Sequence, residues 1–369
     1  MRFKINKERR VPIWCLVVYA LTAVVAVCHV AFYFSSGFAD AFNMTVGAFF
    51  RAVFAKVTGI LPFSLAETVI VSLPVVFIVG LILAIRTILR SSPVKSTRMI
   101  CSMLAALCLL YSGFVTNFAS AYRGSGIEDK LGIEDRPVSA EQLKYTAEYF
   151  RDKATEEAEK LNYSYSGGAP MPYSLREMTS KLNEAYKAVS ERYDFVQSLE
   201  APVKFIALSE PMTYTHISGV YTFFTGEANI NINFPDYCLP FTAAHEMSHQ
   251  RGIAPEDDAN FMAFLVCDES DDPYIRYSGY MSVYEYLLDA LYSANREYYT
   301  EVRDMTDSRL KREFVAYNEF FAAYSDNLAA TVSGTVNDTY LKLQGQTEGS
   351  KSYGMVVDLA VAYHAGSMD

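Results

Sequence analysis

The sequence predicts an α+β protein that opens with three transmembrane helices and continues into a domain with a small sheet and a mostly helical C-terminal half. Three observations support this fold class. Three long charge-free stretches lie in the first third of the chain, alternating polar and apolar residues predict short strands, and capping patterns predict helices around those strands. Because 51% of the residues are hydrophobic, a disordered chain is excluded.

The charge-free stretches run from Val11 to Ala39, from Thr68 to Ile85 and from Met99 to Tyr122. A helix needs about 20 apolar residues to cross a bilayer, so transmembrane helices are expected at about 11–34, 67–89 and 99–120. The first stretch is too long for a signal-peptide core of about 7–15 residues, and no small-residue cleavage pattern follows it. Residues 1–122 therefore form the predicted membrane domain, and residues 123–369 form the predicted second domain.

The distribution of charge predicts the orientation of these helices. The first 120 residues hold 11 Lys and Arg against 3 Asp and Glu, whereas the remaining 249 hold 21 against 39. Lys and Arg gather before the first helix and between the second and third, and the loop between the first and second contains only Arg51 and Lys56. The positive-inside rule then predicts a multi-pass protein of the cytoplasmic (plasma) membrane with an extracytoplasmic C-terminal domain. The acidic domain lacks basic clusters, which excludes nucleic acid as a partner.

The segment from Phe42 to Leu61, between the first two transmembrane helices, is amphipathic. Two interpretations remain open for it. The segment lies on the outer membrane surface, or it forms an ordinary loop helix.

Local patterns predict the elements of the second domain. The capping boxes Ser139-x-x-Gln142 and Ser174-x-x-Glu177 predict helices over 139–161 and 174–198. Pro202 begins a change of period, and strands are expected at 203–208, 220–224 and 228–234. After Pro235 the pattern becomes helical, with helices expected at 242–250, 256–267, 274–300 and 308–330.

His245-Glu246-Met247-Ser248-His249 is an HExxH motif. On a helix, His245 and His249 lie on one face and can bind a single Zn²⁺. Glu246 then lies beside the metal, where its carboxylate can take a proton from the attacking water. The motif predicts a zinc site with His245 and His249 as metal ligands and Glu246 as the catalytic base.

A catalytic zinc site needs a third protein ligand and an open position. The metzincin spacing would place a third histidine where this chain has Pro255, although Gly252 occupies the metzincin glycine position and predicts a sharp turn. Glu256 is the first candidate for the third ligand, and Asp258 and then Asp257 are the alternatives. The same acids would also favour the positive end of a helix without any metal. Asn260, one turn after Glu256, is a candidate for a hydrogen bond that orients this ligand.

Glu256-x-x-Ala259-Asn260 resembles the Glu-x-x-Ala-Asp third-ligand motif of membrane gluzincins. The wider string resembles the domain of unknown function family 3810, bacterial membrane proteins with N-terminal spans and a zincin-like outer domain. The segments that carry the resemblance are 218–221, 224–231, 239–242, 245–252, 256–263, 352–354 and 356–359. This resemblance implies a zincin-like, gluzincin-type outer domain, and it assigns no substrate.

Other residues have weaker functional interpretations. His216 and Tyr353 are candidates for stabilising an oxyanion, although an isolated histidine is more often structural and Tyr353 is one of 27 tyrosines. Glu227 and Asn229 precede the motif and could shape a cleft, but turn and strand-edge roles suffice for them. Cys238 and Cys267 flank the motif, and both a disulfide and two free thiols remain open.

The leading functional hypothesis is a membrane-anchored zinc metallopeptidase that hydrolyses a peptide bond outside the cytoplasmic membrane. Its partners would be the lipid bilayer and a peptide or protein substrate. One alternative is a non-catalytic zinc-containing sensor or scaffold at the cell surface, and another is a zinc amidase acting on a cell-wall or other non-peptide substrate. Glu246 favours chemistry over a sensor, because a structural zinc site needs no general base.

Overall fold

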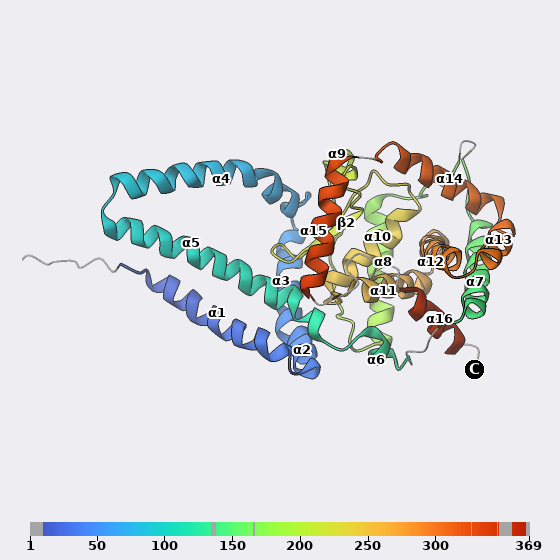
Figure 1. Cartoon of the computed structure of the whole chain (residues 1–369), viewed down its shortest axis with the longest axis horizontal. Helices are drawn as coiled ribbons and strands as arrows, with labels where there is room; N and C mark the ends of the chain where they lie inside the picture. The colour runs from blue at the N-terminus through green and yellow to red at the C-terminus, as the bar shows by residue number, and fades with distance from the viewer. Residues whose placement is uncertain are drawn as a thin grey trace, which may run out of the picture.

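A computed structural model describes residues 10–133, 138–164, 167–325, 327–344, 346 and 356–366. Helices α1 (Ile13–Phe32), α4 (Leu65–Arg90) and α5 (Pro93–Phe114) are long and apolar enough to cross a membrane, which confirms the three predicted apolar helices. They extend together from one end of the molecule, away from the C-terminal domain (Figure 1). The third apolar helix starts six residues before its predicted position, because Pro93 fits the first turn of a helix.

The segment between α1 and α4 consists of α2 (Ser36–Phe42), the π-helix η1 (Asn43–Gly47) and α3 (Ala48–Gly59). Figure 1 shows it crossing from the end of α1 to the start of α4, between these helices and the C-terminal domain. Ala55 of α3 packs against Leu199 and Ala201, and Lys204 donates a hydrogen bond to the carbonyl oxygen of Thr58 (2.9 Å). The interspan segment, which we define as residues 36–64, is thus docked on the C-terminal domain.

A three-stranded sheet lies beside this segment. Its strands are β1 (Lys204–Phe205), β2 (Gly219–Thr222) and β3 (Glu227–Ile230), in the order β1-β3-β2, with β1 parallel and β2 antiparallel to β3. All three strands are found where they were expected, but each is shorter. After Ile230, one more backbone hydrogen bond joins Asn231 to Ser218, and the side chains of Asn231 and Asn233 both donate to the hydroxyl of Thr213 (3.1 Å each), so side-chain bonds follow the end of the ladder.

The rest of the described chain is mostly helical. Its longer helices are α7 (Ala140–Ala158), α8 (Leu175–Arg192), α10 (Cys238–Gln250), α11 (Glu256–Glu269), α12 (Pro273–Ala294), α13 (Arg296–Asp304), α14 (Ser308–Ala322), α15 (Leu328–Gln344) and α16 (Val356–Gly366). Short helical turns are η2 (Val115–Ala119), η3 (Ala121–Arg123), α6 (Ile127–Leu131) and α9 (Ser209–Thr213). The capping box at Ser139 is present as predicted.

Two long helices expected from the sequence are interrupted. The helix expected at 274–300 breaks at Asn295, whose side chain accepts hydrogen bonds from the backbone N–H groups of Glu297 and Tyr298 and so starts α13. The helix expected at 308–330 ends at Ala322, and a new helix begins at Leu328. Both breaks fold the C-terminal half back on itself.

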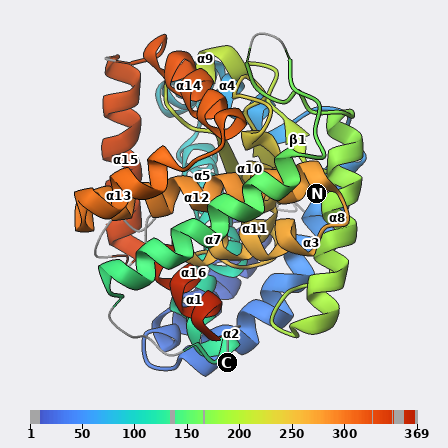
Figure 2. The ribbon, with the colours of Figure 1, turned by 90° about the vertical axis from the view of Figure 1, so that its right-hand side faces the viewer.

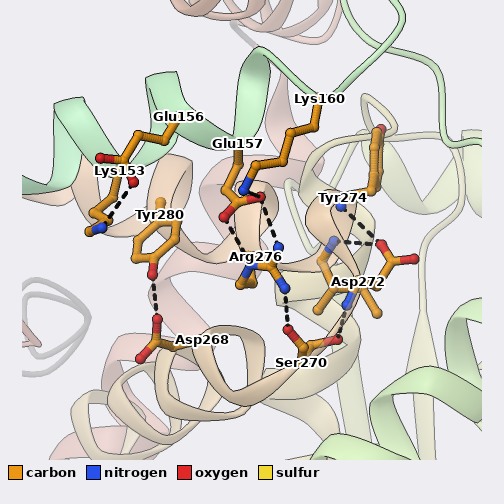
Figure 3. A network of polar contacts seen from close by, with 11 residues as sticks. Lys153, Glu156, Glu157, Lys160, Asp268, Ser270, Asp272, Tyr274, Arg276 and Tyr280 are labelled. Atoms are coloured by element: carbon orange, nitrogen blue, oxygen red, sulfur yellow. Dashed lines mark hydrogen bonds and ion pairs between the residues drawn. The ribbon is translucent and has the colours of Figure 1, made fainter.

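The main core lies between α7, α8 and the central helices α10, α11 and α12. Figure 2 shows α7 lying across α12. A partly buried ion pair connects these two helices, with both carboxylate oxygens of Glu157 accepting from Arg276 (2.9 and 3.0 Å), while Arg276 also donates to the carbonyl of Ser270 (Figure 3). This network fixes the end of α11 relative to α7 and so stabilises the platform behind the motif helix.

Candidate metal centre

The motif helix α10 is the most deeply enclosed element near the sheet. From Leu239 to Gln250 nearly every side chain is buried, and α10 packs on β2 and β3 on one side and on α11 and α12 on the other. The helical period places His245 and His249 one turn apart, with ring centroids at 4.7 Å. The predicted histidine pair therefore shares one buried face.

Glu256, the first residue of α11, completes a cluster with the two histidines. One Glu256 carboxylate oxygen lies 3.1 Å from Nε2 of His245 and 3.5 Å from Nε2 of His249, and the two Nε2 atoms lie 3.1 Å apart. Ligands bound to Zn²⁺ at about 2.0–2.1 Å in a tetrahedron are separated by about 3.3 Å. The three atoms thus have the spacing of three corners of a zinc tetrahedron.

Hydrogen bonding leaves the ligand atoms available. Nδ1 of His249 lies 2.8 Å from the carbonyl oxygen of Ile253 and donates to it, so in the neutral imidazole that would bind a metal the lone pair is on Nε2. Among the described residues, the carboxylate oxygen of Glu256 that faces the histidines has no hydrogen-bond donor of ordinary geometry. A buried acceptor without a donor is costly, and a cation at this position would satisfy it.

The charges of the cluster are strongly coupled. Burial alone would raise the pKa of Glu256, but the His249 and His245 imidazoles outweigh it and lower this pKa to about 2. Burial alone would lower the pKa of His249, but the Glu256 carboxylate outweighs it and raises this pKa to about 9. Both shifts come from the mutual attraction of the His249 imidazole and the Glu256 carboxylate, and a metal ion bound at these atoms would displace the imidazole proton.

Glu246 lies between this cluster and the edge of the sheet. A Cβ atom on Gly219 would come within 2.5 Å of its carboxylate, and the backbone of Tyr221 donates a hydrogen bond to it. Burial raises the pKa of Glu246 to about 7, although the two histidines oppose this effect. The predicted base is therefore enclosed against β2, next to the metal-ligating candidates.

The edge position of β2 leaves main-chain groups unpaired within the sheet. Asn231 N–H donates to the carbonyl of Ser218 (2.8 Å), which makes residues 218, 220 and 222 the hydrogen-bonded partners of β3. The N–H and C=O groups of Gly219 and Tyr221 therefore point away from β3, towards the side where Glu246 lies.

The turn at Gly252 explains why Glu256, and neither of the following acids, faces the histidines. Gly252 has a φ of +87°, Pro255 precedes α11, and the first residue of that helix is directed towards α10. Asp257 instead accepts a hydrogen bond from Gln346 (3.3 Å). Asp258 is buried, and burial together with the Asp257 carboxylate raises its pKa well above the usual value. The role of Glu256 as a metal ligand stays a prediction, now with a geometry that favours it.

Two buried arginines hold this turn in place, and neither was singled out from the sequence as part of the site. Arg251 stacks on Tyr186 (3.8 Å from its guanidinium carbon to the ring centroid) and donates to the carbonyl of Met247 (3.1 Å). Arg51 of α3 donates to the side chain and the carbonyl of Asn43 (2.7 and 2.9 Å), and Asn43 donates to the carbonyl of Gly252 (2.8 Å). The sequence offers one signal for the role of Arg51, namely that it is the single arginine of the amphipathic segment from Phe42 to Leu61.

Aromatic side chains cover the candidate metal centre on the side of the apolar helices. Phe118 of η2, which continues α5, packs edge-on against the His249 ring at 5.6 Å. Tyr122 and Tyr340 of α15 contact each other beside it (6.3 Å). The cluster therefore lies next to the end of the third apolar helix.

Three of the remaining candidates, His216, Glu227 and Asn229, lie outside this cluster. His216 is exposed, has a φ of 59°, and its Nε2 donates to the carbonyl of Tyr324 (2.8 Å). Tyr353 lies outside the described residues. Glu227 accepts hydrogen bonds from the first N–H groups of α4, at Leu65 and Ala66 (3.1 and 2.7 Å), and Asn229 bonds to Ser64 (2.7 Å).

The cysteine question is settled by the structure. All six cysteines, each within the described residues, are free thiols. Cys238 and Cys267 are therefore two free thiols and do not form a disulfide.

The chain matches the model of a family described as "Protein of unknown function (DUF3810)" over residues 42–361. The chain belongs to the DUF3810 family. The match confirms the resemblance drawn from the motif region, and its range takes in most of the interspan segment as well as the candidate metal centre. Comparisons with curated proteins and with solved structures find no match.

Proposed function

We propose that this DUF3810 protein is a zinc metallopeptidase with a zincin-like, gluzincin-type domain, anchored in the cytoplasmic membrane and acting on its extracytoplasmic side. One observation carries the proposal. His245, His249 and Glu256 converge within 4.8 Å in a buried pocket of side chains, and Glu246 lies between them and the edge of β2. Three protein ligands leave the fourth tetrahedral position open, as catalytic zinc requires.

The roles of the residues follow from their positions. When bound at these three ligands, Zn²⁺ supplies Lewis acidity that polarises a carbonyl oxygen and lowers the pKa of water. Glu246 takes the proton of the attacking water and returns it to the leaving amine. Apart from the Tyr221 N–H, which Glu246 engages, the outward main-chain groups of β2 offer hydrogen bonds to a peptide in extended form.

The test uses the full chain in lipid nanodiscs, because the interspan segment contributes to the turn after the motif. Wild type, Glu246→Gln and the carboxylate-to-amide control Asp257→Asn are compared for zinc content and for cleavage of a fluorogenic peptide library. We expect about one zinc per chain in all three, and turnover lower by about 10²–10⁴ in Glu246→Gln alone.

The outcomes of this test are distinct. Equal cleavage by wild type and Glu246→Gln would show that this carboxylate is not the base, and wild type without zinc would refute the proposal. Bound zinc with no cleavage would favour a sensor, and cleavage of cell-wall amides alone would favour an amidase.

The side of the membrane has its own support and its own test. Lys and Arg are concentrated before α1 and between α4 and α5, which favours an extracytoplasmic C-terminal domain. A reporter that is active only in the cytoplasm, fused after Asp369, should stay silent. An active fusion would reverse the orientation.

A further inference from the structure

The helical run formed by η1 and α3, which crosses between α1 and α4, has two unlike faces. On one face, the side chains buried against the C-terminal domain are those of Asn43, Arg51, Ala55 and Thr58. The other face is apolar and 39–82% exposed, and it consists of Val46, Phe49, Phe50, Val53, Val57 and Ile60. These positions follow the helical period, so they form one continuous stripe. A stripe of this kind on a protein surface is an interaction site.

The stripe is continuous with the lipid-facing surface of the apolar helices. Exposed Phe34, just after α1, and exposed Phe38 of α2 precede it, and exposed Phe63 lies just before α4. Figure 1 shows α3 running transverse to α1, α4 and α5, at the ends that face the C-terminal domain. If those helices span a bilayer, α3 is oriented along the plane of its surface.

The charge of the segment also matches a lipid surface. No Asp or Glu occurs between Asp40 and Glu67, and Asp40 is held by Lys130 (3.2 Å) and the backbone N–H of Ser125. Lys56 is the exposed charge on α3, since Arg51 is completely buried. A lysine beside an apolar helical face suits the phosphate groups of lipids.

The metal centre lies directly behind this helix. Phe54 of α3 contacts Gly226, where a Cβ would come within 2.7 Å of the Phe54 Cβ. The carbonyl of Gly226 accepts from Gln250 (2.7 Å), the neighbour of His249. On the other side, Phe118 places the end of the third apolar helix against the His249 ring.

We propose that α3 lies in the plane of the membrane surface, with its apolar stripe in the lipid, and that this contact holds the metal centre at the bilayer surface. The partner of the stripe is lipid of the leaflet on the side of the C-terminal domain. This proposal does not depend on catalysis, because it concerns only where the site is held.

The experiment measures the depth of single tryptophans in the full chain. Trp14, the only tryptophan, is changed to Phe, and Val57→Trp is introduced in the stripe. Tyr145→Trp on α7, at the far side of the C-terminal domain, is the matched control at a similar exposure (56% against 62%). Both variants are reconstituted in phosphatidylcholine–phosphatidylglycerol vesicles whose acyl chains are brominated near the glycerol end.

Brominated lipid should lower the fluorescence of Val57→Trp by about twofold or more and leave that of Tyr145→Trp unchanged, because quenching needs contact with the acyl chains. Aqueous acrylamide should show the opposite preference. Val57→Trp that is quenched by acrylamide as strongly as the control would overturn the proposal. Val57→Trp that neither agent quenches would overturn it too, because a protein partner or a second copy would then cover the stripe. Phe49→Trp, an aromatic exchange, repeats the measurement if Val57→Trp does not fold.

Discussion

Helices α10 and α3 both place polar groups at the Gly252 turn, but at very different separations along the chain. On α10 the contacts are local, since His245, His249 and Ile253 follow one another at intervals of four residues. On α3 and the adjoining η1 they are distant, since Asn43 of η1 contacts Gly252 across 209 residues and Arg51 of α3 contacts the carbonyl of Arg251 across 200. The difference shows that the ligands of the candidate site are set by a local motif, whereas the shape of the turn beyond them is held by another part of the chain.

The two regions also differ in how they balance charge. The histidines of α10 face the Glu256 carboxylate. Arg51 is fully buried and is held by neutral oxygens, from Asn43 and, at longer range, from Gln197 (3.4 Å). Burial lowers the pKa of Arg51 to about 10, so it remains charged at neutral pH. Loss of α10 groups should therefore affect metal binding, and loss of Arg51 should affect folding.

The largest effect is expected from Glu256→Ala, which removes one candidate ligand from the cluster that follows from the local motif. Zinc affinity should fall by more than about 100-fold, since even groups that only orient a ligand contribute 10–100-fold. Competition with a chromogenic zinc chelator measures it, and Asp257→Ala is the control from the next position of α11. If Glu256→Ala retained zinc and Asp258→Ala lost it, Asp258 would be the third ligand.

Arg51→Met tests the long-range contacts that the interspan segment makes at the Gly252 turn. Removing the guanidinium leaves the side-chain oxygen of Asn43 without this donor, whereas its backbone oxygen still accepts from the N–H of Ala48, so the free energy of unfolding should fall by about 1–3 kcal/mol. Denaturant titration in mixed micelles measures this change. Lys56→Met, an exposed position on the same helix, should change it by no more than about 0.5 kcal/mol. Equal effects of the two substitutions would mean that the buried contacts of Arg51 contribute nothing specific.

The smallest effect is a coupling between the two regions where they meet. A Cβ on Gly252 would lie 2.3 Å from Nη2 of Arg51, so Gly252→Ala should destabilise the wild type more than it destabilises the Arg51→Met variant. The positive φ of Gly252 adds a cost in both backgrounds. A double-mutant cycle of unfolding free energies should give a coupling of about 0.5–3 kcal/mol, as for residues in contact. Strict additivity would show that α3 and the turn are independent.

The sequence by itself determined the features that depend on local periodicity or length. Three apolar stretches of sufficient length gave three apolar helices, Ser139 and Gln142 formed their capping box, and the HExxH spacing brought His245 and His249 to one face. Each of these follows from the helical repeat and from the cost of exposing apolar side chains, which act within a few residues.

Only the tertiary structure decided which groups surround the motif. The same local rules allowed Glu256, Asp257 or Asp258 to face the histidines, and the path of the Gly252 turn selected Glu256. The interspan segment, open between two interpretations, proved to hold that turn through Asn43 and Arg51. Contacts across 200 residues leave no periodic pattern in the sequence, because they arise only when whole elements pack together. In that packed arrangement, the hydrogen bonds to Arg51 are favourable enough to bury its guanidinium.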